Sequence, residues 1–153
     1  MPGEVINEAI LIIASVMLIG ALVGSVYVSI TYIGGAMTQS SLHGSQKLLT
    51  EVQIDYATNI SSTIVSAYLQ NTGSVPIQDI QLSTMYFGPQ NQELPISFGG
   101  PAPNWNTTAA VLNPGQTISI NITSATPLTQ NQFYSMMYVT PNGISASYTL
   151  QVA

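Results

Sequence analysis

The sequence predicts an α+β protein: a long N-terminal hydrophobic α-helix followed by an immunoglobulin-like antiparallel β-sandwich. The stretch from Ala9 to Ile33 has no charged residue and is apolar on all sides, as expected of a helix buried in lipid or among other helices. From Val52 onward, apolar and polar residues alternate over short runs separated by turn residues, which is typical of half-buried strands. We therefore expect a helical region over residues 1–50 and a sandwich over residues 51–153.

The apolar stretch is long enough to cross a membrane, since a helix rises about 1.5 Å per residue and the hydrocarbon core is roughly 30 Å thick. Gly20 and Gly24 form a G-x-x-x-G pair, and further small residues follow at a spacing of four. Such rows let helix backbones approach closely in lipid, although an ordinary membrane anchor is the alternative. The predicted packing positions are Ala14, Gly20, Ala21, Gly24, Ser25 and Ser29.

The two ends of the apolar stretch carry different signals. Glu4 and Glu8 lie at the start of the helix, where a carboxylate favours the positive end of the helix dipole. Gly34 and Gly35 follow the stretch and predict a flexible or kinked joint. The segment from Ala36 to Thr50 is expected to be weakly helical.

About seven or eight strands are expected after the helix. One predicted strand covers Asp79 to Phe87, because Ile80, Leu82 and Tyr86 fall in an alternating pattern. The other runs are Val52–Tyr56, Ile64–Gln70, Leu94–Phe98, Ile118–Ile122, Phe133–Thr140 and Ile144–Val152, with Val111–Leu112 leading into a turn. The loop from Gly99 to Thr107 is the longest irregular piece, and its Trp105 is expected to cover the edge of the core or to bind a ligand.

Composition excludes several classes of function. Lys47 is the only Lys or Arg, against six acidic residues, and nucleic-acid binding needs many basic side chains to neutralise phosphate. There is no Cys and only one His, His43, so neither a Ser-His-Asp nor a Cys-His arrangement is expected. We expect no enzymatic activity, no metal and no cofactor. The uncharged polar surface suits a protein exposed to harsh pH or salt, since little of it titrates.

Three sequons of the form N-x-[ST] begin at Asn59, Asn106 and Asn121. The motif is short and chance supplies it often in a chain rich in Asn, Ser and Thr. Asn59 and Asn106 are expected in loops, where a glycan would be tolerated, and Asn121 on the polar face of a strand.

The arrangement resembles the archaeal type IV pilin superfamily, which includes adhesive pilins, archaellins and archaellum stator proteins. The stretch AYLQNTGSVPI, Ala67 to Ile77, is similar to a strand and turn of their sandwich domains, and LNPGQTISI, Leu112 to Ile120, to a later hairpin. The resemblance implies a filament core of helices coated by sandwiches. It also implies that the subunit is embedded in the membrane before assembly and that a leader peptidase and pilus assembly machinery are its partners. Many members of the family have a glutamate at the fifth position of the mature chain. Cleavage after Gly3 would give that position to Glu8; Glu4 and Glu8 both stay candidates.

Two classes of function remain open. The first is a structural subunit of an extracellular homopolymeric filament, an archaeal type IV pilus used in adhesion. In archaellins a Gln-Lys pair follows closely after the helix. Here the Gln-Lys pair, Gln46 and Lys47, lies farther along the chain, and this departure favours a pilus over the archaellin alternative. The second class is a membrane-anchored module, either a stator or a surface-layer-binding sandwich. In the filament, Glu4 or Glu8 is expected to pair with the N-terminal amine of a neighbouring subunit.

Overall fold

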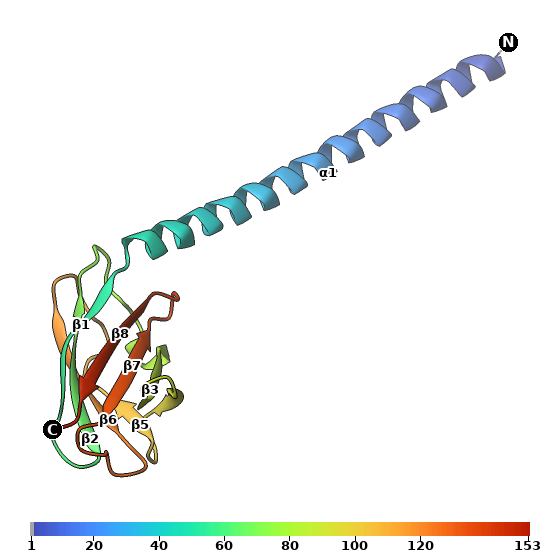
Figure 1. Cartoon of the computed structure of the whole chain (residues 1–153). Coiled ribbons are helices and arrows are strands. Elements are labelled where there is room, and N and C mark those ends of the chain that lie inside the picture. The colour runs from blue at the N-terminus through green and yellow to red at the C-terminus, as the bar shows by residue number, and fades with distance from the viewer. Residues whose placement is uncertain (1) are drawn as a thin grey trace. The chain divides into compact units, whose positions relative to one another are not determined.

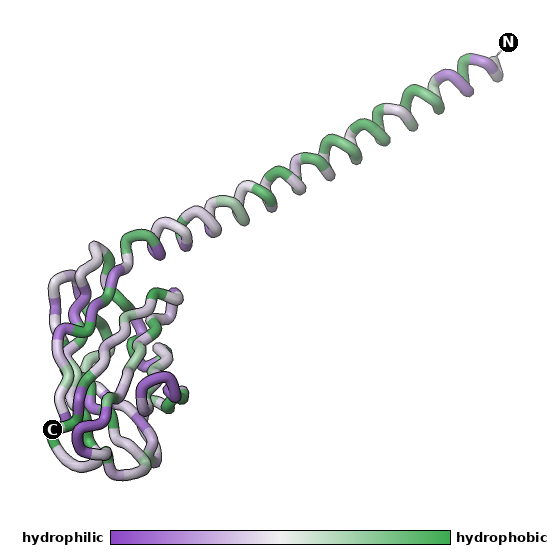
Figure 2. Tube along the Cα trace, in the orientation of Figure 1, coloured by the Kyte–Doolittle hydropathy of each residue, from purple (hydrophilic) through white to green (hydrophobic). Residues whose placement is uncertain are grey.

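One uninterrupted helix, α1 (Pro2–Leu49), forms the N-terminal part of the computed structural model, which describes residues 2–153 (Figure 1). Hydrophilic residues lie at its N-terminal end, a long hydrophobic stretch follows, and its last turns again carry more polar residues (Figure 2). The chain divides into two compact units, one ending at Gly44 and the other spanning Ser45–Ala153. The predicted fold class, a long apolar helix followed by a β-sandwich, is therefore confirmed.

The second unit contains eight strands that are connected through hydrogen bonds in the order β1-β2-β6-β5-β4-β3-β7-β8. All neighbouring pairs are antiparallel except the short parallel pair of β4 and β5. The strands are β1 (Val52–Asn59), β2 (Ile64–Asn71), β3 (Thr84–Pro89), β4 (Leu94–Phe98), β5 (Asn104–Asn106), β6 (Thr117–Thr123), β7 (Phe133–Val139) and β8 (Ser145–Gln151). The two ends of this order, β1 and β8, lie close to each other, so the sandwich is nearly a closed barrel.

The core forms because alternate residues of each strand point inward. In β6, for example, Ile118, Ile120 and Ile122 are buried while the residues between them face solvent. Trp105 is completely buried at the centre and makes edge-to-face contacts with the rings of Phe98 and Tyr138, at 4.8 and 6.1 Å between centroids. Such aromatic pairs stabilise a core by about 0.5–1.5 kcal/mol beyond the area they bury.

Two expectations about this region are wrong. Ile80 and Leu82 lie on a short 3-10 helix, η1 (Ile80–Leu82), and not on the strand that begins at Thr84. Asp79, just before η1, has a left-handed backbone with φ of 52°, which breaks the extended run. Trp105 lies on the short strand β5 inside the core, so it is neither a lid at the core's edge nor an exposed binding residue.

The last turn of α1 belongs to the second unit and is fixed there by hydrogen bonds. The Thr50 hydroxyl donates to the Gln46 carbonyl at 2.7 Å and accepts from the Asn142 side-chain amide at 2.7 Å. The Ser74 N–H donates to the Leu49 carbonyl at 2.8 Å. Gly73 permits this close approach, because a Cβ there would lie 2.5 Å from the same carbonyl oxygen.

Candidate functional site

The helix α1 is the first candidate site, because its side chains are exposed from Gly3 to Leu49 although most are apolar. Among the described residues it is the one helix long and apolar enough to cross a membrane, a test that signal sequences near an N-terminus also pass. Its 48 residues span about 70 Å at 1.5 Å per residue. That length is about twice the hydrocarbon thickness of a bilayer.

The predicted packing positions form open surface on the helix. A Cβ at Gly20 or Gly24 would meet nothing within 4 Å in the single chain. The hydroxyls of Ser25 and Ser29 donate to the carbonyls of Leu22 and Ser25, at 2.8 and 2.9 Å. Because these hydroxyls are satisfied inside the helix, they do not need water and are compatible with lipid or with another helix. Ala14 and Ala21 are exposed as well.

The remaining predicted helix residues are exposed and helical. Glu4 and Glu8 lie near the start of α1, where Glu4 is in the first turn. Gly34 and Gly35 lie in a continuous stretch of helix that extends to Leu49, so the described backbone has no break at this point. A hinge at the two glycines and a charge pairing at the two glutamates stay predictions.

The three sequon asparagines lie at strand positions. Asn59 is the last residue of β1 and Asn106 the last of β5, so the expectation that both lie in loops is wrong. Asn121 is exposed on β6, on its polar face as expected, and directly opposite Asn106 in the antiparallel pair. Asn59 is half-buried, and its side-chain oxygen accepts a hydrogen bond from the Ala153 N–H at 3.3 Å.

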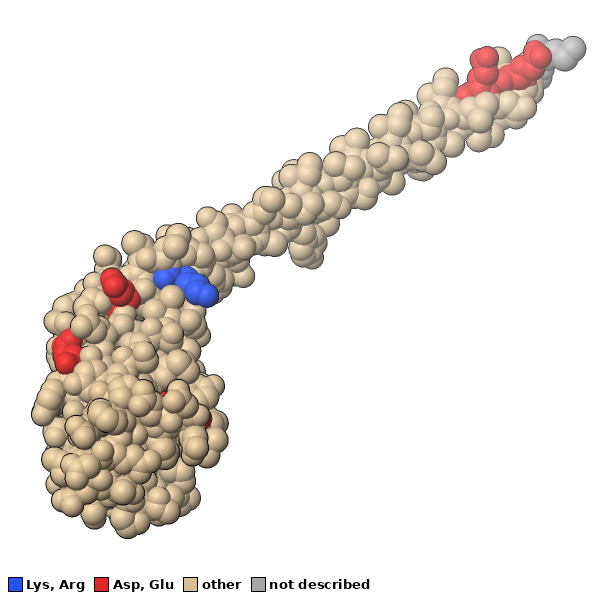
Figure 3. Space-filling model, viewed as in Figure 1, with Lys and Arg blue, Asp and Glu red and all other residues tan. Residues whose placement is uncertain are grey.

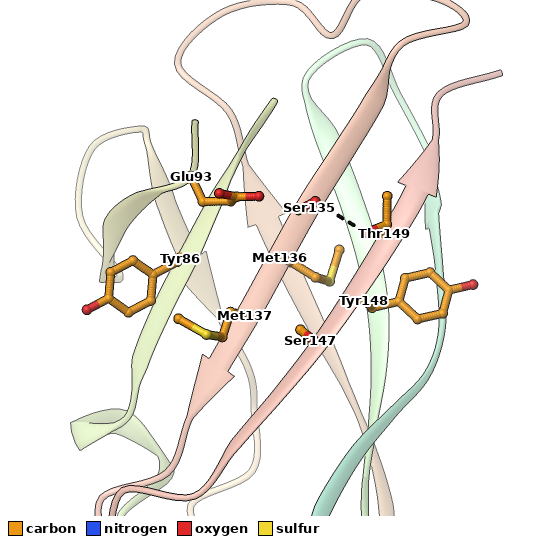
Figure 4. Close-up of a pocket in the computed structure, with 8 residues that line it drawn as sticks. All are labelled: Tyr86, Glu93, Ser135, Met136, Met137, Ser147, Tyr148 and Thr149. Atoms are coloured by element: carbon orange, nitrogen blue, oxygen red, sulfur yellow. Dashed lines mark hydrogen bonds between the residues drawn. The ribbon is translucent and has the colours of Figure 1, made fainter. Parts of the chain in front are cut away.

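A second candidate site is a groove of about 380 Å³ on the β3–β7–β8 sheet (Figure 4). Its base is formed by two neighbouring rows of residues that are paired across the three strands, and each row is called a rung below. The first rung is Tyr86, Met137 and Ser147, and the second is Gly88, Ser135 and Thr149. Met136 and Tyr148 complete the lining.

Glu93 lies over the second rung, with its carboxylate directed toward Ser135 (Figure 4). The carboxylate accepts a hydrogen bond from the Asn91 N–H at 3.0 Å. Its own backbone N–H, the Asn91 N–H and the Ser135 hydroxyl hold the pKa of Glu93 below its usual value. Hydrogen bonds to the charged form have this effect, so the carboxylate is ionised at neutral pH.

The groove was not predicted from the sequence. The alternating pattern of the expected strand puts Tyr86 on the same face as Ile80 and Leu82, whereas in β3 the core-facing residues are Met85 and Phe87, and Tyr86 lies on the other face. The signal that could have located Glu93 is Gly88, five residues before it, because a glycine inside a strand often marks the close approach of another backbone. The described residues contain no group of three or more His, Asp or Glu side chains arranged to hold a metal.

Comparison with known proteins places these features in a family. The model of the archaeal-type flagellin family matches residues 3–150. No curated protein matches the sequence significantly. Among solved structures, the archaellum periplasmic stator protein FlaG from Sulfolobus acidocaldarius is 46% identical, with a TM-score of 0.65 over 67% of this chain and 100% of that one.

Two further structures extend the comparison. The FlaF–FlaG stator complex from Sulfolobus acidocaldarius matches at 47% identity and a TM-score of 0.64, over 69% of this chain and 93% of that one. The archaeal flagellum of Methanospirillum hungatei matches over 95% of this chain and 92% of that one, at 16% identity and a TM-score of 0.66, which shows a shared fold. Because the family model covers nearly the whole sequence, the chain belongs to the archaeal-type flagellin family.

Proposed function

We propose that this protein is a membrane-anchored component of the archaellum, of the stator type. The observation that carries the proposal is the 46% identity over the full length of the FlaG chain, compared with 16% for the filament subunit that covers more of this chain. The anchor would be α1, and the sandwich would lie outside the cytoplasmic membrane. A FlaF-like protein is the proposed partner, since FlaG is found with FlaF in the solved complex.

The archaellin alternative, a subunit of the motility filament, is the second candidate. It is supported by the shared fold along 95% of the chain, including the N-terminal helix. In that case, copies of α1 would pack through Gly20, Gly24 and their small neighbours to form the filament core. The adhesive pilus, favoured from the sequence, is supported by neither comparison and is the least favoured of the three.

Three finer features remain part of the proposal. A leader peptidase would cut after Gly3, Glu4 or Glu8 would pair with the amine of a neighbouring subunit in a helical assembly, and glycans would be attached to sequons on the sandwich. The supports are the position of both glutamates at the start of α1 and the exposure of Asn106 and Asn121.

Cell fractionation together with a deletion strain tests the proposal. A stator-type protein is expected in the membrane fraction and absent from sheared, purified archaella, and its deletion should abolish swimming in soft agar. Expression of the wild-type chain in the deletion strain should restore swimming. Recovery of the chain as a major component of sheared archaella would establish the filament alternative instead. Normal swimming combined with loss of surface adhesion would support the pilus.

A further inference from the structure

The groove on the β3–β7–β8 sheet contains one charged group in otherwise neutral surroundings. Its lining is Tyr86, Glu93, Ser135, Met136, Met137, Ser147, Tyr148 and Thr149. From Leu94 to the C-terminus the chain has no charged side chain, and the visible face of the sandwich is almost entirely uncharged (Figure 3). A fixed carboxylate on such a surface gives this groove a charge that most of the sheet lacks.

The backbone holds Glu93 in place above the sheet. Gly88 leaves the necessary space, since a Cβ there would lie 2.6 Å from the Gln92 carbonyl oxygen. The turn is attached to β7 because the Gln90 N–H donates to the Phe133 carbonyl at 3.1 Å. The Asn91 N–H then fixes the carboxylate itself at 3.0 Å. The position of the negative charge is therefore built into the hairpin between β3 and β4.

The described residues offer no cation to this carboxylate. Lys47 is the only Lys or Arg of the chain, and hydrogen bonds alone, with no basic side chain among the causes, lower the pKa of Glu93. Covering an ionised carboxylate with a partner surface is costly unless a cation pairs with it. An anionic partner is disfavoured by the same charge.

The other lining groups suit the rest of a long basic side chain. Tyr86 and Met137 are neighbours on the first rung, next to Glu93 in the groove (Figure 4). A tyrosine ring attracts a cation within about 6 Å, and apolar groups cover the methylene stem of Arg or Lys. The hydroxyls of Ser135 and Thr149, 3.2 Å apart, can accept hydrogen bonds from a guanidinium or ammonium group.

We propose that this groove binds one arginine or lysine side chain presented by a partner protein. The charge of Glu93 and the neighbouring aromatic and thioether groups favour a basic side chain, and the groove of about 380 Å³ has room for one. The inference does not depend on the archaellum function, because it concerns only the surface of the sandwich and is tested with purified protein.

A peptide titration monitored by NMR tests the site. The full-length chain in detergent micelles, with labelled methionine methyl groups, is titrated with the blocked peptide acetyl-Gly-Ser-Arg-Ser-Gly-amide. The control peptide has citrulline, which is neutral and has nearly the same shape, in place of arginine. We expect a saturable shift of the Met137 methyl resonance with the arginine peptide and at least fivefold weaker binding of the citrulline peptide.

Two variants identify the carboxylate responsible. Glu93→Gln should weaken arginine-peptide binding at least fivefold, because it removes the charge and keeps the size. Glu51→Gln is the matched control, since Glu51 is a carboxylate of the sandwich unit that is exposed and lies outside the groove. This variant should bind as the wild-type protein does.

Several results would overturn the proposal. The first is equal binding of the arginine and citrulline peptides, and the second is unchanged binding of the arginine peptide by Glu93→Gln. The third is an equal loss of binding in Glu51→Gln, because it would show unspecific attraction of the peptide to carboxylates. A shift of Met137 on raising the protein concentration alone, abolished by Lys47→Gln, would assign the groove to a second copy of the chain. A shift produced by phosphatidylglycerol vesicles in place of the peptide would assign it to the membrane surface.

Discussion

At the scale of single residues, Asn71 stands out because it is completely buried and uses its whole side chain. Its amide donates to the carbonyls of Val75 and Leu112 at 2.8 and 2.9 Å, and its oxygen accepts from the Gly73 N–H at 2.9 Å. Asn71→Ala would leave the half-buried Val75 carbonyl without a partner. It would also remove one of two hydrogen bonds from the Leu112 carbonyl and from the Gly73 N–H, which keep their bonds to the Ile77 N–H and the Glu51 carbonyl. An unsatisfied buried group costs about 1–3 kcal/mol, and each further lost hydrogen bond about 0.5–1.5 kcal/mol.

We therefore expect Asn71→Ala to lower the free energy of unfolding by about 2–5 kcal/mol. Urea unfolding followed by the fluorescence of Trp105, the single tryptophan, measures this change. Asn121→Ala is the matched control, since Asn121 is exposed, and should change stability by no more than about 0.5 kcal/mol. Equal stability of the two variants would contradict the role assigned to Asn71.

Tyr138 predicts a dependence of stability on alkaline pH. Burial raises the pKa of its hydroxyl above the usual value, and the hydrogen bond from or to Ser83, at 2.7 Å, opposes this only in part. The unfolded chain loses the phenolic proton first as pH rises, so the contribution of Tyr138 is complete below about pH 10 and falls above it. We expect unfolding free energy to decrease between pH 9 and 11.

The variant Tyr138→Phe isolates this effect. It should show a smaller loss of stability between pH 9 and 11 than the wild-type chain, while at pH 7 it should be destabilised by about 1–3 kcal/mol because Ser83 loses its partner. Urea unfolding at each pH provides both numbers. A pH dependence identical to that of the wild-type chain would show that other groups are responsible.

At the scale of elements, the sequence predicted the helix and most strands because their signals are local. Ile118, Ile120 and Ile122 alternate without exception, and the strand β6 follows them. The short strand β5 could not be predicted, since three residues around Trp105 carry no periodicity and pair only because β4 and β6 lie on either side. Asp79 also carries no local signal of its left-handed backbone.

The two candidate sites also differ in whether their signals are local in the sequence. The helix positions were read directly from spacing, because residues four apart share one face of a helix. The groove brings together β3, β7, β8 and the turn before β4, so its residues are up to 63 positions apart, from Tyr86 to Thr149. Only the strand order places them on one face.

Gly24→Leu tests whether α1 packs against another helix. In the single chain a side chain at Gly24 meets no atom within 4 Å, so the variant should not affect the folding of one chain or its insertion into the membrane. Any loss of self-association in detergent, measured by energy transfer between labelled chains, must then come from a second helix. We expect at least a fivefold weaker association if the small-residue rows are a packing surface.

Val26→Leu is the matched control, because at 100° per residue Val26 lies on the side of the helix opposite Gly24. It adds a methylene group at an exposed apolar position and should leave association unchanged. Equal association of all three chains would support a simple anchor, with no helix packing through the glycines.

At the scale of the whole molecule, the sequence places few ionisable groups on the sandwich. Its second unit, Ser45–Ala153, contains Lys47, Glu51, Asp55, Asp79 and Glu93 as its only charged side chains. Acid unfolding results mainly from carboxylates whose pKa is lower in the folded than in the unfolded chain. Hydrogen bonds hold the pKa of Glu93 below its usual value, and the side chain is half-buried.

We therefore expect the sandwich to resist acid and salt. Glu93 contributes stability above its unfolded pKa of about 4.3 that is lost as pH falls through its lower folded pKa, and solvent screening keeps this contribution small. The free energy of unfolding should fall by less than about 2 kcal/mol from pH 7 to pH 2. It should change by less than about 1 kcal/mol between 0.05 and 1 M NaCl, because few charge pairs exist to be screened. Urea unfolding followed by Trp105 fluorescence measures both, with Glu93→Gln as the matched variant that removes the contribution of this carboxylate. A sandwich that unfolds near pH 3, in the wild-type chain and in Glu93→Gln alike, would show that other carboxylates stabilise the fold.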